Sequence, residues 1–337
     1  MTRAARRVLF LAMEAGAASY LAPLWTRWAA GSRSDVLLGP AALQHLQRLG
    51  FAAPPQTELR EFSAAALDAS LAIRPALLVA SATGAQAEAE ALALARRQGV
   101  PTVQVIDTWH NYAARFLPGA MLPDRIAVID LRARAEATAE GLPADRLAPV
   151  GHPAWERAGR LPSAPLDEVL FVGQPIRQIY GERLGYDEHS AWALCQAVAR
   201  RRPDLIRTLR YLPHPAESVA GRDDLTPDDL AADPAAAFKR SGTVLGMFSS
   251  LMVDALLGGR RVVSVQPDRR GPDPCSLHRH GHIGCAATAE QLETLLSDPA
   301  SRNTEDLHQA LSGSLDRLES LLGSMLSAPD LEGAASS

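Results

Sequence analysis

The sequence predicts an α/β protein built on parallel, doubly wound sheets. Short apolar runs bounded by turn residues alternate with helical patterns along most of the chain, which is the rhythm of β–α–β units. The length of 337 residues suffices for two domains, each with a core of its own. A hydrophobic content of 47% beside 21% charged residues is typical of a soluble globular chain.

The N-terminal half shows the more regular alternation. Its helical stretch at residues 84–99 has glutamates early and arginines late, which matches the helix dipole and marks a scaffold helix. Around it we expect strands at residues 8–13, 34–39, 76–81, 101–107 and 125–130, and further helices at residues 19–28 and 41–49.

The C-terminal half contains, at residues 243–267, a β–α–β unit whose turn carries candidate ligand-binding residues. A buried strand leads into Ser249 and Ser250, a helix follows, and a second buried strand ends the unit. Serine hydroxyls and free backbone N–H groups at a helix start bind phosphate, and Asp254, one turn further on, can reach a ribose hydroxyl. The alternative is simple N-capping by serine, which is common.

A second strand of this half, at residues 207–215, ends in the pair His214 and Pro215. Proline forces an extended backbone at the preceding residue and stops the strand, which leaves the imidazole at the strand's carboxyl end. Ligands of open parallel sheets bind at the carboxyl ends. A turn histidine without function is the alternative, but a His-Pro pair followed about 35 residues later by Ser-Ser is a more specific combination.

The pairs His214-Pro215 and Ser249-Ser250 resemble the HP and SS motifs of bacterial sialyltransferase-like glycosyltransferases, which use CMP-activated sugars. The chain is also similar to CDP-glycerol glycerophosphotransferases and UDP-N-acetylglucosamine 2-epimerases, which share the GT-B fold. The resemblance implies two Rossmann-like domains facing across a cleft, with these four residues on the nucleotide's phosphate and ribose. The D/E-D/E-G signature of some CMP-using families is missing.

The resemblance also implies a division of labour between two domains. Residues 1–160 would bind the acceptor and residues 161–337 the nucleotide-sugar, with a Pro- and Arg-rich linker at residues 157–167. The first turn of the second domain would bring Gln174 and Arg177 to the donor phosphate or a sugar carboxylate, since arginine binds both groups in bidentate fashion.

Polar and aromatic residues crowd behind the strand at residues 101–107. Asp107 and His110 are candidates for the general base that deprotonates an acceptor hydroxyl, and Glu14, behind the first strand, is a third. Aromatic faces cover the C–H surfaces of sugars, and amides bond their hydroxyls. The expected acceptor-binding residues are Trp109, Asn111 and Tyr112.

The charge and hydropathy of the sequence bear on whether the protein binds nucleic acid or spans a membrane. The net charge is −4 with both signs well mixed, so no nucleic-acid footprint stands out. No stretch reaches 18 apolar residues without a charge, so we expect no transmembrane helix and a cytoplasmic location, with which peripheral membrane association is compatible. Three widely spaced cysteines fit reduced thiols.

Cysteines and histidines crowd the loop at residues 275–285, which raises a metal hypothesis. Their spacing lacks the paired geometry of zinc modules, so a loop that faces a ligand or solvent is expected, and neither a metal nor another cofactor is predicted. The residues concerned are Cys275, His278, His280, His282 and Cys285.

These observations lead to an expected enzyme: a metal-independent GT-B glycosyltransferase of cell-surface polysaccharide synthesis. It would move a nonulosonic or Kdo-type sugar from a CMP-activated donor to a hydroxyl of a glycan, glycolipid or protein, while His214 neutralises the departing phosphate. Two alternatives stay open. One is a nucleotide-sugar 2-epimerase, which needs several carboxylates around the sugar. The other is a non-catalytic GT-B protein that binds a nucleotide or glycan.

Overall fold

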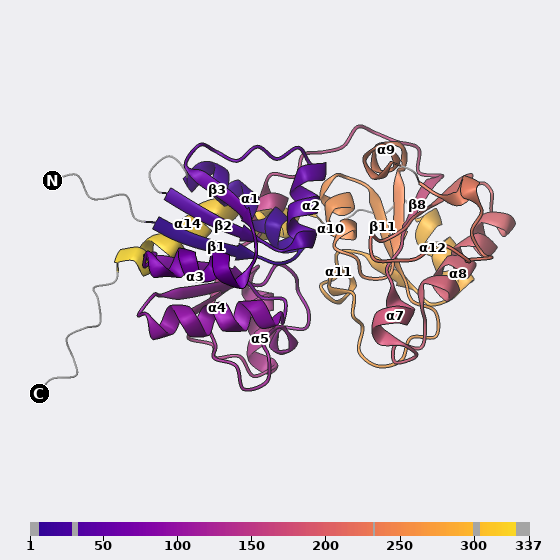
Figure 1. Ribbon diagram of the computed structural model, residues 1–337. Helices are drawn as coiled ribbons and strands as arrows, with labels where there is room; N and C mark the ends of the chain where they lie inside the picture. The colour runs from indigo at the N-terminus through magenta and orange to yellow at the C-terminus, as the bar shows by residue number, and fades with distance from the viewer. Residues whose placement is uncertain (1–6, 29–32, 232, 299–303, 328–337) are drawn as a thin grey trace, which may run out of the picture. The chain divides into compact units, whose positions relative to one another are not determined.

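The computed structural model describes residues 7–28, 33–231, 233–298 and 304–327. Within these ranges the chain forms two compact units, each built on one parallel sheet (Figure 1). Unit 1 comprises the residues up to 157 together with those from 310 onward, and unit 2 comprises residues 158–309. The expected fold class, two Rossmann-like α/β units, is confirmed.

Unit 1 contains a seven-stranded sheet in the order β3-β2-β1-β4-β5-β6-β7. Successive side chains of β1 point to opposite faces: Val8 and Phe10 join one apolar cluster, and Leu9 and Leu11 join another. The strands are β1 (Arg7–Ala12), β2 (Arg33–Leu38), β3 (Thr57–Glu61), β4 (Leu77–Ser81), β5 (Thr102–Val105), β6 (Arg125–Val128) and β7 (Leu147–Pro149).

Helices cover both faces of this sheet (Figure 1). Apolar residues of α1, α2 and α14 pack on one face, and those of α3 and α4 pack on the other. No described helix has the length and apolar character that crossing a bilayer requires. The helices of unit 1 are α1 (Ala15–Trp28), α2 (Pro40–Arg48), α3 (Ala64–Ala72), α4 (Gln86–Arg97), η1 (Ala113–Arg115), α5 (Leu131–Ala139), α6 (Pro153–Glu156) and α14 (Ser314–Ser327).

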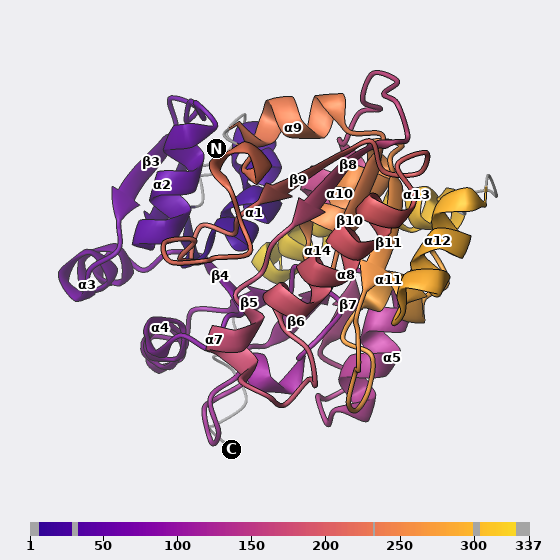
Figure 2. The ribbon, with the colours of Figure 1, turned by 90° about the vertical axis from the view of Figure 1, so that its right-hand side faces the viewer.

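Unit 2 contains a five-stranded sheet in the order β12-β11-β10-β8-β9. Figure 2 labels the strands β8 to β11 of this sheet. Its main core lies between the strands and the helices α8 and α12, with Trp192 and Phe171 as large buried members. The elements are β8 (Glu168–Val172), α7 (Ile176–Tyr180), α8 (Glu188–Arg201), β9 (Thr208–Leu212), η2 (Pro227–Asp229), α9 (Pro234–Arg240), β10 (Thr243–Gly246), α10 (Leu251–Leu257), β11 (Arg261–Val265), α11 (Ser276–Arg279), β12 (Gly284–Ala286), α12 (Ala289–Ser297) and α13 (Glu305–Leu311).

The strand order of each sheet reverses once, which marks its switch point. In unit 1 the chain order runs outward in both directions from the pair β1–β4, and in unit 2 from the pair β8–β10. In open parallel sheets, ligands bind outside the carboxyl ends of the strands at this point. The candidate site residues are therefore considered at these two edges.

The C-terminal helix differs from the sequence expectation. The expected second domain ran to residue 337, but residues 310–327, the described part beyond residue 309, pack with unit 1. The apolar face of α14 places Leu315, Leu318 and Leu322 in the core of the first sheet. An amphipathic pattern fixes which face of a helix is buried, but not which sheet buries it.

Candidate functional site

One side chain bridges the switch point of unit 2. Gln174 follows β8, and its Oε1 accepts a hydrogen bond of 2.8 Å from the backbone N–H of Phe248, which follows β10. The amide therefore fixes the start of the serine turn, residues 248–250. The carbonyl oxygen of Gln174 makes this positioning contact, and the expected contact of Gln174 with the donor stays a prediction.

His214 presents a hydrogen-bond donor at the carboxyl end of β9. Its Nδ1 accepts a hydrogen bond of 3.1 Å from the backbone N–H of Ala216, so a neutral ring carries its proton on Nε2. Loss of hydration lowers the pKa of His214, while the negative charge of Glu217 acts in the opposite direction. A neutral imidazole in this tautomer still donates to an oxygen anion.

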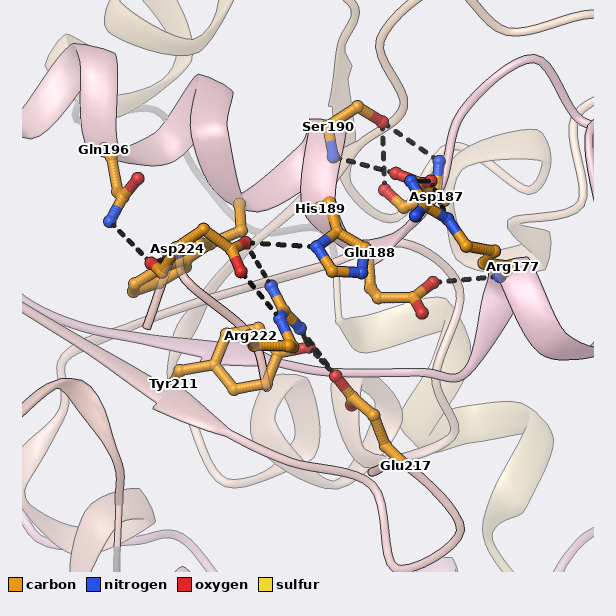
Figure 3. Close-up of polar contacts among 11 residues, drawn as sticks. Arg177, Asp187, Glu188, His189, Ser190, Gln196, Tyr211, Glu217, Arg222 and Asp224 are labelled. Atoms are coloured by element: carbon orange, nitrogen blue, oxygen red, sulfur yellow. Dashed lines mark hydrogen bonds and ion pairs between the residues drawn. The ribbon is translucent and has the colours of Figure 1, made fainter. Parts of the chain in front are cut away.

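A buried ion pair supports the loop that carries His214 (Figure 3). Glu217 and Arg222 approach to 2.7 Å, and their side chains are 3% and 5% exposed. Glu217 accepts hydrogen bonds from the backbone N–H of His214, at 3.2 Å, and from the hydroxyl of Tyr211. Arg222 in turn binds Asp224 through two nitrogens, at 2.9 and 2.5 Å. The backbone at His214 is thus tied to a network of charges.

Gly173 lies directly against this network. A Cβ at this position would lie 2.5 Å from Oε2 of Glu217 and 2.6 Å from the hydroxyl of Tyr211, so any other residue here would displace the ends of these two side chains. The absence of a side chain at the end of β8 therefore lets the buried carboxylate reach the edge of the sheet.

Arg177 is engaged with acidic neighbours rather than exposed as a lone cation (Figure 3). Its guanidinium donates to Asp187 through two nitrogens, at 2.8 and 2.5 Å, and its backbone N–H donates to Glu188 at 2.9 Å. These contacts anchor α7 to the start of α8. A phosphate contact by Arg177 would have to compete with the Asp187 ion pair.

The two serines of the serine turn differ in their contacts: the side chain of Ser249 accepts a backbone hydrogen bond, and that of Ser250 makes no capping bond. The Oγ of Ser249 accepts a hydrogen bond of 3.3 Å from the backbone N–H of Leu251. Ser250 makes no side-chain capping bond and is exposed. Because α10 spans only Leu251–Leu257, its dipole contributes little, and the Ser250 hydroxyl is the better candidate for contact with a ligand. Asp254 lies in the first turn of the same helix.

The switch point of unit 1 is organised by a buried carboxylate. The backbone N–H of Met13, behind β1, donates to the Oγ of Ser81 at 3.1 Å. Ser81 donates to Glu88, which also accepts from the backbone N–H of Thr83 at 2.7 Å. Burial raises the pKa of Glu88, although these hydrogen bonds act against the shift. Glu88 thus fixes the loop behind β4.

Two of the three candidate bases lie together at this edge. Loss of hydration, and then the charge of Asp107, raise the pKa of Glu14. Asp107 packs directly against Gly16 at the start of α1 and lies 3.4 Å from Arg115, which donates to Thr108 at 2.6 Å. Asp107 thus has a cationic partner in Arg115, which favours its ionised form. The raised pKa of Glu14 favours the protonated, neutral form of that carboxyl group.

The third candidate base has a different setting. The carbonyl of His110 accepts a hydrogen bond of 3.3 Å from Nε of Arg115, which draws the loop behind β5 together. His110 itself is half-buried. Its role as a base stays a prediction.

The expected aromatic rim needs correction. Trp109 and Tyr112 are 2% and 1% exposed, so their faces are not available to an acceptor. The indole of Trp109 donates to Asp130 at 2.8 Å and stacks on Trp155, while Tyr112 donates to a glutamate of α5. Among the expected acceptor residues Asn111 is exposed, with a φ of 57° that asparagine tolerates.

The histidine- and cysteine-rich loop forms no recognisable metal centre in the described part of the chain. No group of three or more His, Cys, Asp or Glu side chains there is arranged to hold a metal ion. Cys275 is buried, and burial raises the pKa of its thiol to about 12. The loop does contain one close pair, Asp273 and His278.

Comparisons with known proteins extend these observations. No protein-family model matches the chain, and no curated protein matches it. Among solved structures, the UDP-GlcNAc 2-epimerase from Neisseria meningitidis bound to UDP-GlcNAc has a TM-score of 0.63 at 13% identity, covering 94% of this chain and 100% of the other. The UDP-GlcNAc 2-epimerase from Methanocaldococcus jannaschii has a TM-score of 0.63 at 9% identity, covering 94% and 99%.

A third similar structure comes from a different class of enzyme. A UDP-glucosyltransferase from Polygonum tinctorium, capable of glucosylating indoxyl, has a TM-score of 0.57 at 11% identity, covering 98% and 100%. At such identities the likeness defines the fold alone. The chain has the GT-B fold, which these epimerases and this transferase share.

Several residues of the two edges have no signal of their own in the sequence. Glu217, Arg222 and Glu88 are charged residues in or beside loops, where solvent exposure is the ordinary expectation. Only the fold shows that they are buried and paired. Arg115 is equally inconspicuous in the sequence, although it pairs with Asp107 and donates a hydrogen bond to the carbonyl of His110 in the loop behind β5.

Proposed function

We propose that the protein is an enzyme acting on a nucleotide-activated sugar, with the nucleotide bound at the switch-point edge of unit 2. The observation that carries the proposal is the fixed ring of His214, whose Nε2–H is a donor for a phosphoryl oxygen. Ser250 and Asp254, on the other side of β8, are the partners for phosphate and ribose. Because structures bound to uridine nucleotides share the fold, UDP is favoured over CMP.

Epimerisation at C2 of the sugar is the first candidate reaction. It removes a proton from carbon and returns one to the opposite face, so it needs an acid and a base in unlike environments. Glu14 and Asp107 form such a pair, because the former has a raised pKa and the latter is paired with Arg115. The similarity to UDP-GlcNAc 2-epimerases agrees with this choice.

Transfer of the sugar to a hydroxyl acceptor is the second candidate. The order of the His-Pro and Ser-Ser pairs favours it, and a single base such as Glu14 suffices for deprotonating the acceptor. A CMP-activated nonulosonic or Kdo-type sugar remains the donor proposed on those motifs.

The reaction itself separates the candidates. Incubation with UDP-GlcNAc in D₂O is expected to place deuterium at C2, detected by mass spectrometry, and Glu14→Gln or Asp107→Asn is expected to slow exchange by roughly a hundredfold or more. His308→Gln, on the exposed side of α13, is the matched control with an unchanged rate. Release of nucleotide that requires an acceptor, without exchange, would favour transfer. Binding without either reaction would support the non-catalytic alternative.

A further inference from the structure

A histidine–carboxylate pair lies behind β11, on the same sheet edge as the serine turn. Nδ1 of His278 lies 2.5 Å from Oδ2 of Asp273. The carboxylate side chain is 9% exposed, whereas the imidazole is 39% exposed. The pair thus has a buried, fixed end and a solvent-facing end.

The surroundings of Asp273 determine which nitrogen of the imidazole carries the proton. Its Oδ1 accepts from Nε2 of Gln266 and from the backbone N–H of Cys275, both at 2.8 Å, and Arg269 lies 3.0 Å from Oδ2. Burial opposes the charge, but the hydrogen bonds, led by that of His278, hold the pKa of Asp273 below its ordinary value. An ionised carboxylate only accepts, so Nδ1 of His278 donates, and in the neutral form of the ring Nε2 is left as an acceptor.

A chain of hydrogen bonds connects this pair to the serine turn. Ser264, in β11, donates to the carbonyl of Met247 at 2.6 Å, directly before residues 248–250. Gln266 contacts both the Oγ of Ser264 and Asp273 at 2.8 Å. The orientation of His278 is therefore coupled to the strand ends by buried polar contacts.

The two imidazoles of this edge have opposite hydrogen-bonding character. His214 offers Nε2–H as a donor, and His278 offers Nε2 as an acceptor. Their strands, β9 and β11, are three strand spacings apart in the sheet order, which is about 14 Å. An acceptor nitrogen requires a hydrogen-bond donor from its ligand, and an ionised phosphate has none, so the partner of His278 is a donor such as a hydroxyl group.

We propose that His278, positioned by Asp273, accepts a hydrogen bond from a hydroxyl of the ligand's carbohydrate part, either the ribose or the activated sugar. The inference rests on the proposed function, because it needs a nucleotide-sugar at this edge. It adds a hydroxyl-reading group to the phosphate and ribose contacts described above. Asp273 is a positioning residue in this account, since it acts through the imidazole.

The tautomer can be tested without any ligand. Side-chain ¹⁵N NMR of the full chain, with His278 assigned by comparison with His278→Ala, is expected to show a protonated Nδ1 and an unprotonated Nε2 near neutral pH. Asp273→Asn is expected to mix the two tautomers. A neutral ring with its proton on Nε2 in the wild type would overturn the inference, whatever binds.

Calorimetric titration with paired ligands tests the contact itself. UDP against 2′,3′-dideoxy-UDP forms the ribose arm, and UDP-GlcNAc against UDP forms the sugar arm. In one of the two arms, the ratio of the two dissociation constants is expected to fall about tenfold in His278→Ala, which corresponds to the loss of one hydrogen bond. The control variant His308→Ala is expected to keep the wild-type ratio in both arms.

The outcomes distinguish this inference from the proposed function. If UDP binds and both preferences are unchanged in His278→Ala, the hydroxyl contact is wrong and the nucleotide site stands. If no uridine ligand binds the wild type, the proposed function falls and this inference falls with it.

Discussion

His152 and His214 each precede a proline, yet only one is available to a ligand. His152 is 3% exposed, its Nδ1 accepts from the backbone N–H of Trp155 at 3.3 Å, and its ring stacks on that indole. His214 also accepts a backbone N–H on Nδ1, from Ala216 two residues further on, but the residue is exposed. The sequence pair sets the local turn, and burial decides whether the imidazole can meet a ligand.

Burial of His152 predicts a pH dependence of stability. Burial lowers its pKa from 6.5 to about 3, so between these values the unfolded chain binds a proton that the folded chain does not. The free energy of unfolding contributed by this site is therefore lost as the pH falls below 6.5, by at most about 1.4 kcal/mol per pH unit. Urea titrations of His152→Asn, which keeps a capping acceptor, are expected to show a shallower acid slope. Equal slopes in the wild type, His152→Asn and the exposed control His308→Asn would contradict this account.

The buried ion pair of Glu217 and Arg222 predicts that removal of one partner destabilises the protein more than replacement of both. Arg222→Ala leaves the buried carboxylate of Glu217 without its partner, and the free energy of unfolding is expected to fall by about 3–5 kcal/mol. The double variant Glu217→Leu with Arg222→Met is expected to recover much of that loss, because the buried carboxylate is removed, and Asp224, which also loses Arg222, is partly exposed to solvent. Arg202→Ala, which breaks an exposed ion pair with Asp204, is the control with a much smaller loss. Equal losses in both single variants would show that the buried pair is not coupled as described.

Among the secondary-structure elements, the sequence predicts those strands and helices that have a clear local pattern of apolar residues. The strands with continuous apolar runs, such as β1, β4 and β11, are evident because both of their faces are buried. Strand β3 at the sheet edge has the sequence TELRE, and β12 has only three residues, so neither has a recognisable strand pattern.

The same distinction applies to the candidate site. His214 and the serine turn are visible because proline and serine act on their own backbone. Glu217 and Asp273 depend on partners brought close by the fold, such as Tyr211 and Gln266, so spacing alone does not reveal them. The rim expected of Trp109 failed for the related reason that sequence does not report burial.

The assignment of α14 to unit 1 predicts where its stability effect lies. Leu318 is fully buried in the core of the first sheet, whereas Leu321 lies at its margin. Leu318→Ala is expected to lower the free energy of unfolding by about 2–5 kcal/mol, and Leu321→Ala by clearly less. Denaturant titration followed by circular dichroism measures both. A loss in Leu318→Ala no larger than that in Leu321→Ala would contradict the packing of α14.

At the scale of the whole molecule, two doubly wound units use the same construction. Each bridges its switch point with one side chain: Ser81 holds Met13 in unit 1, and Gln174 holds Phe248 in unit 2. The chemistry at the two edges differs. Unit 1 gathers carboxylates, and unit 2 gathers imidazoles and hydroxyls suited to phosphate and ribose.

Nucleotide binding by unit 2 through His214 is open to a direct measurement. The experiment is isothermal titration of UDP, UMP, CDP, CMP and dTDP into the wild type, His214→Ala and the control His308→Ala. We expect a uridine nucleotide to bind tightest, His214→Ala to weaken it at least tenfold, and the control to match the wild type. Tightest binding of CMP would restore the CMP-sugar transferase as the leading candidate. Absence of binding by every nucleotide, or equal affinity in His214→Ala, would contradict the account.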